Sequence, residues 1–339
     1  MKSNIKMIDI ARQLGLSRST VSRALADSPL INTETRKRVK ELSEQLGFRA
    51  DLNARSMITQ KSNIIGCLVY SLAYNAPLAS ILEVVQERLK SLNYELYIVS
   101  GANDPELQSY LVDRMLSRRV DGVILVPPPV NPITRYEPLN MVIQAGVPCT
   151  VFGYYFDCPL NQVCVDLFLT GYTIGRHLID IGHKNIATVY LDADDPRIAG
   201  MKKALSESGM SLPEKYFIQR KPHKYGEPGF KSNCDRLCKK IIESGASAVF
   251  VDSDYVSVYA VNSLKKLGVS VPSQIAVATA GNSLPLNSLT PSITSYEWPY
   301  DLLADTLADV IVEAVEKPSA PVKHINLPGS LVIRESTCS

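Results

Sequence analysis

The 339-residue sequence lacks the motifs that mark common enzyme classes. It contains no G-x-G-x-x-G or G-x-x-x-x-G-K-[ST] loop for phosphates and no G-x-S-x-G turn for a nucleophilic serine. Its four histidines are dispersed along the chain, so the sequence does not group them into a catalytic set. We therefore expect no enzymatic activity and no cofactor.

The sequence also lacks a spacing of cysteines that indicates disulfide pairs. The seven cysteines are odd in number and scattered, which favours reduced and mostly buried thiols over a disulfide framework. Cys234 and Cys238 are one helical turn apart, but no further histidine or cysteine pair completes a set of metal ligands. We expect no metal site.

No convincing membrane segment is present either. Residues 62–82 carry no charge and are long enough to span a bilayer, but polar and helix-breaking residues interrupt them. They read better as a buried strand, a polar loop and a helix. The first residues, MKSNIKMIDIARQ, lack the apolar core of a secretory signal. The expectation is a soluble cytoplasmic protein with no membrane partner.

What the sequence does have is enough chain for about two domains and an uneven distribution of charge. Apolar residues make up 45% and charged residues 21%, as in globular proteins. Residues 1–60 hold 11 Lys and Arg against 6 Asp and Glu, a net charge of +5, whereas the remaining residues carry −3. This asymmetry favours a polyanionic partner for the N-terminal end.

The first sixty residues predict three short helices. Apolar residues at helical spacing give the first helix one inner face: Met7, Ile10, Ala11 and Leu14. Gly15 ends it, and Ser17 is the predicted N-cap of the second helix. Asn32 or Thr33 is the predicted N-cap of a third helix, which Gly47 closes. Two short helices joined by a tight glycine turn, with a third helix behind them, describe a helix-turn-helix module.

The predicted outer face of the second helix carries side chains that read DNA: Arg18, Ser19, Ser22 and Arg23. Arginine bonds bidentately to guanine, and serine reaches several base edges. The third helix adds four cations: Arg36, Lys37, Arg38 and Lys40. Solvated charges on a small helical bundle would explain any one of these helices equally well. The combination of turn, caps and positive excess favours DNA binding.

The segment IDIARQLGLSRSTVSRALADSPLINTETRKRV resembles the DNA-binding headpiece of the LacI/GalR family of bacterial transcription regulators. The resemblance implies base contacts by Arg18, Ser19 and Arg23. It also implies contacts to the DNA backbone by Ser17, Ser22, Asn32, Thr35 and Arg36. One departure is Lys6, which replaces the usual Thr or Ser cap and is expected to weaken that cap by about 1 kcal/mol.

The linker, residues 48–61, reads FRADLNARSMITQK, and its part from Phe48 through Met57 resembles the hinge helix of that family. The resemblance makes Met57 an apolar wedge in the minor groove at the operator centre. Ala50 replaces the usual proline, so the hinge entry is expected to be less rigid. An ordinary flexible linker is the alternative, and a hinge that folds only on DNA is compatible with both.

From Ile64 onward, short apolar runs alternate with helical patterns. The predicted strands cover residues 64–70, 94–100, 121–127, 148–153, 185–191, 248–252 and 275–280. The predicted helices lie near residues 78–92, 105–118, 134–145, 167–181, 197–208, 230–244, 255–267 and 300–316. Strands this apolar are covered on both faces, so we expect two doubly wound parallel sheets with helices on each side.

The body resembles the sensor domain of the same family, which is similar to periplasmic sugar-binding proteins. The segments RRVDGVILVP, RIAGMKKAL and LPGSLVIREST carry this resemblance. It implies an effector site formed by Tyr74, Asn75, Tyr154, Asp166, Arg197, Asp254 and Asn282. Two carboxylates common in the family are replaced here, so the usual monosaccharide template is in doubt. Capping of the following helix is an alternative role for Asp166 and Asp254.

These expectations combine into one domain plan. Residues 1–50 are an all-α headpiece, 51–62 the hinge and 63–339 an α/β body. The body's N-subdomain takes residues 63–160 and 294–322, and its C-subdomain takes 161–293 and 323–339. We expect a homodimeric, sequence-specific transcription regulator, a repressor, on pseudo-palindromic operator DNA. Its effector is a small polar metabolite, a sugar or sugar derivative. The alternative is a solute-binding protein without a regulatory DNA role.

Overall fold

The helices and strands form two compact units, Met1–Ser62 and Asn63–Ser339. This division falls where the sequence ends the predicted hinge. The computed structural model describes residues 5–25, 27–48, 61–70, 72, 76–102, 104–128, 136–153, 158–221, 229–282 and 285–338.

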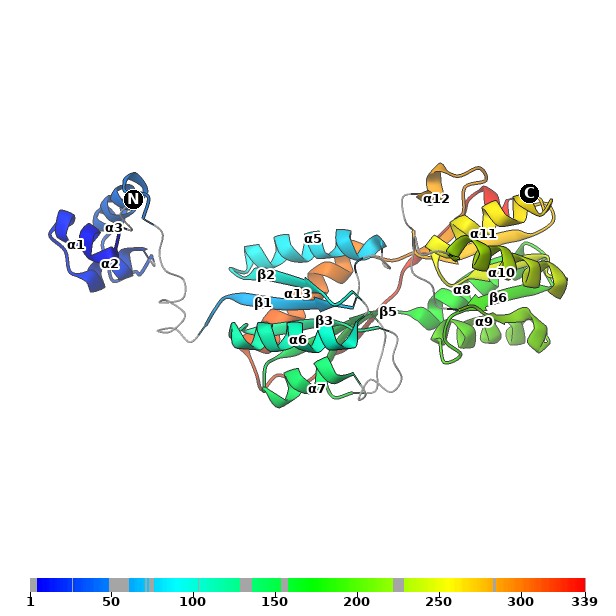
Figure 1. Cartoon of the computed structure of the whole chain (residues 1–339), viewed down its shortest axis with the longest axis horizontal. Coiled ribbons are helices and arrows are strands. Elements are labelled where there is room, and N and C mark those ends of the chain that lie inside the picture. Colours follow the sequence, from blue (N-terminus) through cyan, green and yellow to red (C-terminus); the bar gives the residue numbers. More distant parts are fainter. Residues whose placement is uncertain are drawn as a thin grey trace. The chain divides into compact units, whose positions relative to one another are not determined.

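The first unit is the predicted three-helix module: α1 (Met7–Leu14), α2 (Arg18–Leu25) and α3 (Thr33–Gln45) (Figure 1). Its small core is formed by Ile10, Ala11, Val21, Ala24 and Val39. Gly15 between α1 and α2 has φ 65°, a conformation that glycine adopts without steric cost. The tight turn that the sequence predicts there is therefore confirmed.

Caps fix the ends of these helices. Ser17 Oγ accepts a hydrogen bond from the Thr20 amide at 3.0 Å, and Asn32 Oδ1 accepts one from the Thr35 amide at 2.7 Å. Both are the predicted caps of α2 and α3. Lys6 provides no side-chain cap for α1, as its chemistry requires. Instead the Asp9 carboxylate accepts from the Lys6 amide at 2.9 Å, so one amide at this helix start is still bonded.

The second unit contains two six-stranded sheets. The sheet of the first lobe has the order β11-β5-β4-β3-β1-β2, and all its strands run parallel. Its strands are β1 (Ile64–Val69), β2 (Glu95–Ser100), β3 (Gly122–Val126), β4 (Cys149–Gly153), β5 (Asn161–Val165) and β11 (His324–Leu327). Figure 1 shows α5 (Ala76–Ser91) and α13 (Tyr300–Glu316) on one face, with α6 (Pro105–Ser117) and α7 (Glu137–Gln144) on the other.

The sheet of the second lobe has the order β12-β10-β9-β8-β6-β7. Its strands are β6 (Ile186–Tyr190), β7 (Phe217–Gln219), β8 (Ala248–Val251), β9 (Ala276–Ala280), β10 (Thr294–Glu297) and β12 (Ser330–Val332). One face packs against α8 (Leu167–Asp180) and α9 (Pro196–Glu207), and the other against α10 (Phe230–Ser244) and α11 (Asp254–Lys266). A one-turn helix, α12 (Pro285–Ser288), follows β9.

The predicted layers are confirmed, but the chain crosses between the lobes later than expected. The crossings follow β5, β10 and β11, about four or five residues after the predicted boundaries at residues 160, 293 and 322. These three strands and β7 and β12 were not predicted, because runs of three to five residues with interspersed polar side chains carry little periodic signal. β12 also pairs antiparallel with β10, against the expectation of purely parallel sheets.

Two sequence interpretations of this unit can be checked directly. The charge-free stretch at residues 62–82 contains β1 and the start of α5. No helix among the described residues is long and apolar enough to span a membrane. Six of the seven cysteines are buried, all but Cys338, and burial raises the pKa of the Cys67 thiol to about 12.

Candidate functional site

The exposed face of α2 presents the three predicted base-contacting residues together. Arg18, Ser19 and Arg23 are all exposed, while Val21 and Ala24 on the opposite face are fully buried. Neither arginine forms an ion pair with any residue that the structure describes. Burial of the inner face therefore orients two uncompensated guanidinium groups outward, as recognition of a polyanion requires.

The N-terminus of α2 carries a group of three hydroxyls. Ser17 Oγ lies 2.7 Å from Ser19 Oγ and 2.8 Å from Thr20 Oγ1. A hydroxyl has one donor and two acceptor positions, so Ser19 keeps capacity for a further hydrogen bond. Ser22, expected to contact the DNA backbone, is half-buried one turn further along.

The residues predicted to contact phosphates at the start of α3 differ in their exposure and in their hydrogen bonds. Asn32 is exposed and caps the helix through its side chain, and Thr35 supplies the capped amide. Arg36 is half-buried, with its Nη atoms 3.4 Å from the Asp27 carbonyl and from Thr33 Oγ1. Its Nε is buried and has no hydrogen-bond partner among the described residues, which leaves a donor for an incoming acceptor.

The other positively charged residues of α3 differ in whether a carboxylate lies close to them. Lys40 Nζ lies 2.7 Å from Asp27 Oδ1, and this hydrogen-bonded lysine lowers the pKa of the Asp27 carboxyl group. Lys37 lies 3.9 Å from Glu41 in an exposed pair. Arg38 is exposed and has no ion pair in the part of the chain that the structure describes. On α2 and α3, the exposed positive charges without a carboxylate partner among the described residues thus include Arg18, Arg23 and Arg38.

In the second unit, the carboxyl end of the second-lobe sheet gathers charged side chains. The strand order reverses between β6 and β8, and ligands of doubly wound sheets bind at such points. Arg197, in the first turn of α9 after β6, donates from Nη1 to the carbonyl of Asp252 after β8 at 2.7 Å. It also donates from Nε and Nη2 to the Asp195 carboxylate at 3.0 Å and 2.5 Å.

These contacts make Arg197 a buried and internally bonded residue. Its side chain is 7% exposed and that of Asp195 is 4% exposed. Burial opposes ionisation of Asp195, but the charge and hydrogen bonds of Arg197 outweigh it, so the pKa of Asp195 lies below its ordinary value. Asp252 is held in turn by Arg220, whose Nε donates to Asp252 Oδ1 at 2.8 Å.

Asp254 and Asn282 lie at the same end of the sheet. Asp254 begins α11, and its carboxylate approaches Gly281 so closely that an added Cβ would lie 3.0 Å from Oδ2. Asn282 follows Gly281 and is bonded at both ends of its amide. Its Oδ1 accepts from Arg334 Nη2 at 2.7 Å, and its Nδ2 donates to Glu297 Oε1 at 2.7 Å. The Asn282 side chain therefore links three chain segments.

Asp166 has the capping role that the sequence left open. It is half-buried, and its Oδ1 accepts from the Leu169 amide at 2.7 Å at the start of α8. Asp254, by contrast, is the first residue of α11 rather than its cap, which is Ser253. Capping occupies one oxygen of Asp166 and does not exclude a ligand at the other.

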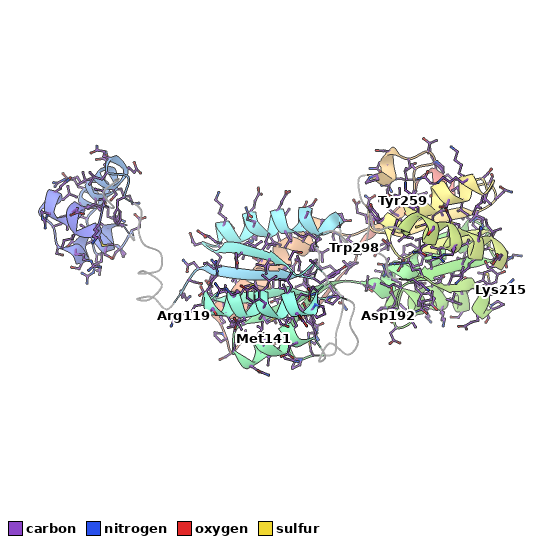
Figure 2. All side chains as sticks on the ribbon, in the orientation of Figure 1. Arg119, Met141, Asp192, Lys215, Tyr259 and Trp298 are labelled. Atoms are coloured by element: carbon purple, nitrogen blue, oxygen red, sulfur yellow. The ribbon has the colours of Figure 1, made fainter. Side chains whose placement is uncertain are left out.

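Two aromatic residues at the crossing into α13 were missed by the sequence analysis. Trp298 Nε1 is buried and has no hydrogen-bond partner among the described residues. Its ring lies 6.4 Å from that of Tyr300, whose hydroxyl accepts from the Asn282 amide at 3.2 Å. Burial raises the pKa of Tyr300 to about 12, so the phenol is protonated. Figure 2 labels Trp298 in the segment that leads into α13.

The structure thus brings Arg197, Asp254 and Asn282 to one end of the second-lobe sheet, with Asp166 at a crossing. Four predicted site residues lie outside the described residues: Met57, Tyr74, Asn75 and Tyr154. The sequence contains only weak indications of two residues that its analysis missed, Asp252 and Trp298. Asp252 directly follows the apolar run of β8, and Trp298 is the one tryptophan of the sequence.

Comparison with known proteins gives matches for both units. Residues 6–51 match the model of bacterial regulatory proteins of the lacI family, and residues 176–337 match a periplasmic binding protein-like domain. The sequence is 24% identical to catabolite control protein A of Priestia megaterium, covering 98% of this chain and 99% of the relative. It is 26% identical to the HTH-type transcriptional repressor PurR of Erwinia tasmaniensis, covering 97% and 95%.

Solved structures share the fold across nearly the whole chain. The lac repressor dimer bound to operator and the anti-inducer ONPF superposes with a TM-score of 0.84 at 21% identity, covering 99% of this chain and all of that one. The complex of the transcriptional regulator CelR with cellobiose gives a TM-score of 0.73 at 22% identity, covering 98% and 99%. The expected combination of a helix-turn-helix module with a two-lobed α/β body is confirmed.

Proposed function

We propose that this chain is a transcription repressor controlled by a small polar metabolite, because its first unit matches the lacI family of bacterial regulatory proteins and its relatives along the whole chain are transcription regulators. The observation that carries the proposal is the exposed face of α2. There, Arg18 and Arg23 have no carboxylate partner among the described residues and stand beside the Ser19 hydroxyl. A solute-binding protein without a DNA role has no use for this face.

In this proposal α2 enters the major groove and reads bases with Arg18, Ser19 and Arg23. Backbone contacts come from Ser17, Ser22, Asn32, Thr35 and Arg36. The wedge role of Met57 stays a prediction from the family resemblance.

One headpiece reads few base pairs, so the proposal includes a homodimer on a pseudo-palindromic operator. The lac repressor in the superposed structure is a dimer on operator DNA, which supports this part. A repressor works where the chromosome is, so the proposed location is the cytoplasm. The proposal includes no enzymatic role, because the relatives named above are regulators.

The effector is proposed to bind at the carboxyl end of the second-lobe sheet. CelR binds cellobiose, and a regulator of the family from Enterococcus faecium binds ribose, which supports a sugar or sugar derivative. Arg197 and Asp254 would supply charged contacts. Trp298 would add an aromatic face and a donor, since its buried Nε1 has no partner among the described residues.

The DNA-binding part is tested by the salt dependence of binding to a duplex selected from a random pool. The full chain should lose affinity steeply as salt rises, because each neutralised phosphate releases counterions. A chain lacking residues 1–62 should bind the same duplex far more weakly and with a flat salt dependence. Equal binding by the two chains would contradict a DNA-binding role for the first unit.

The effector part has a built-in probe, because Trp298 is the sole tryptophan. Its fluorescence should change saturably when the correct metabolite from a panel of sugars and sugar derivatives is added to the full chain. The same metabolite should alter operator affinity at fixed salt, by about 1–3 kcal/mol. A metabolite that binds without changing operator affinity would not be the regulatory effector.

A further inference from the structure

A separate pocket lies beside the edge strand of the second-lobe sheet, between β7 and α10. Its volume is about 180 Å³. It shares no residue with the described members of the proposed effector site, which are Asp166, Arg197, Asp254, Asn282 and Trp298. A ligand there would be additional to the effector of the proposed function.

The lining of this pocket is cationic. Among the described residues, no carboxylate lines it, and four of the lining residues are positively charged: Arg220, Lys221, Arg236 and Lys240. Arg220 is compensated by Asp252 at 2.8 Å. The other three form no ion pair with any residue that the structure describes. About three uncompensated positive charges therefore face one small volume, which favours a ligand that carries more than one negative charge.

One side of the pocket, its floor, is apolar. Phe230, Cys234 and Leu237, on one face of α10, are buried and line it. The Phe230 ring packs edge-on against Tyr259 of α11 at 4.9 Å and lies 5.9 Å from the Tyr255 ring. Figure 2 labels Tyr259 in this layer. An apolar floor below a cationic rim suits a molecule with an apolar body and an anionic end.

We propose that this pocket binds a small organic phosphate ester with an aromatic or other apolar body. A phosphate monoester is close to dianionic at neutral pH and accepts the paired hydrogen bonds that a guanidinium such as Arg236 donates. Lys221 and Lys240 supply further charge, and Asn233 supplies an amide. The volume lies below the roughly 300–1,000 Å³ of drug-sized pockets, so it admits only a small molecule.

The first experiment is calorimetric titration of phenyl phosphate into the full chain. We expect saturable binding with one site per chain. Inorganic phosphate lacks the apolar body, and benzyl alcohol lacks the charge, so each should bind at least roughly tenfold more weakly. Equal affinity for phenyl phosphate and inorganic phosphate would overturn the proposed role of the apolar floor.

A pair of double variants on α10 separates a defined site from a general effect of charge. Arg236→Gln/Lys240→Gln removes two lining cations and should weaken phenyl phosphate binding at least about tenfold. Lys231→Gln/Lys239→Gln removes two exposed cations of the same helix that do not line the pocket, and should leave the affinity unchanged. Within the described part of the chain, the three lysines form no hydrogen bond or ion pair and Arg236 bonds only Asn233 of its own helix, so both variants should fold.

No saturable binding of phenyl phosphate to the full chain would overturn the proposal, as would equal weakening in both double variants. The result does not depend on the proposed function, because calorimetry of the DNA-free chain requires neither operator nor effector. A failure of operator binding would leave this titration unaffected.

Discussion

Arg18 and Arg23 on α2 are exposed and form no ion pair with the described residues, whereas Arg197 on α9 is buried and bonded to Asp195 and to the Asp252 carbonyl. The first unit thus holds its functional cations apart from its own carboxylates, ready for an external polyanion. The second unit instead buries its candidate arginine, Arg197. Removing this charge from water costs free energy, which the bonds to Asp195 and to the Asp252 carbonyl must offset.

An arginine can therefore serve a function either from an exposed or from a buried position, with different consequences for stability. An exposed arginine contributes to binding and little to folding, because water already satisfies it. A buried arginine contributes to both, because removing it leaves a buried carboxylate without its partner.

Arg197→Ala should lower the unfolding free energy of the second unit by about 3–5 kcal/mol, because Asp195 would remain buried without its partner. Urea denaturation followed by circular dichroism measures this. Arg23→Ala is the matched substitution in the first unit and should change stability by no more than about 0.5 kcal/mol. The contrast fails if the two substitutions destabilise the chain equally.

Gly200→Ala should destabilise the second unit by about 1–3 kcal/mol, because an added Cβ would overlap the Phe168 carbonyl on α8. The substitution pushes α9 away from α8 and shifts the turn that carries Arg197. Ser206→Ala, at an exposed position on the same helix, is the control and should be nearly neutral. Thermal unfolding distinguishes the two, and a neutral Gly200→Ala would argue against the rigid mounting of Arg197.

Arg23→Ala should cost about 1–3 kcal/mol of operator affinity and relax the preference at particular base pairs, without loss of stability. Binding to the selected operator and to single-base variants at fixed salt measures both effects. Arg114→Ala, an exposed arginine on α6 of the body, removes the same charge and is the control. Unchanged base preference after Arg23→Ala would contradict base readout by this residue.

The smallest expected effect is a pH dependence of stability that arises from histidines. It should be confined to the second unit, because residues 1–62 contain no histidine. Burial lowers the pKa of His177 below its ordinary 6.5, and the same holds for His183. Protonation therefore favours the unfolded chain, so the stability of the second unit should fall as pH drops below about 6.5. The pKa of Asp195 is lowered from 3.8, so this carboxyl group does not titrate in that window.

Urea unfolding between pH 8 and pH 5 tests this, and His177→Gln should flatten the dependence. His177 Nε2 lies 2.8 Å from Thr337 Oγ1, and glutamine can keep a hydrogen bond there without titrating. An unchanged pH profile in His177→Gln would assign the effect to other groups.

Much of the fold was predictable because local signals were strong. All eight helices predicted for the body are present within about three residues of their bounds, since apolar residues recur along them at the helical period. The same is true of the seven predicted strands, most of which are apolar runs buried along their length, the edge strand β2 being the exception. The five strands that were missed are three to five residues long, and their pairing is decided by neighbours far away in the sequence.

The candidate site was predictable only in part. The face of α2 follows from helical periodicity, since burying Val21 and Ala24 forces Arg18 and Arg23 outward. The contact of Arg197 with the Asp252 carbonyl joins residues 55 positions apart, and nothing in either local sequence indicates it.

The sequence by itself determined which segments are helices, where the first unit turns at Gly15 and which side chains of α2 are exposed, because these depend on interactions over a few residues. The strand order, the late crossings between the lobes and the contacts of Arg197 with Asp252 and of Asn282 with Arg334 were settled by the tertiary structure alone. Those features depend on which strand ends meet at the edge of a sheet, and that is set by packing between residues distant in the chain.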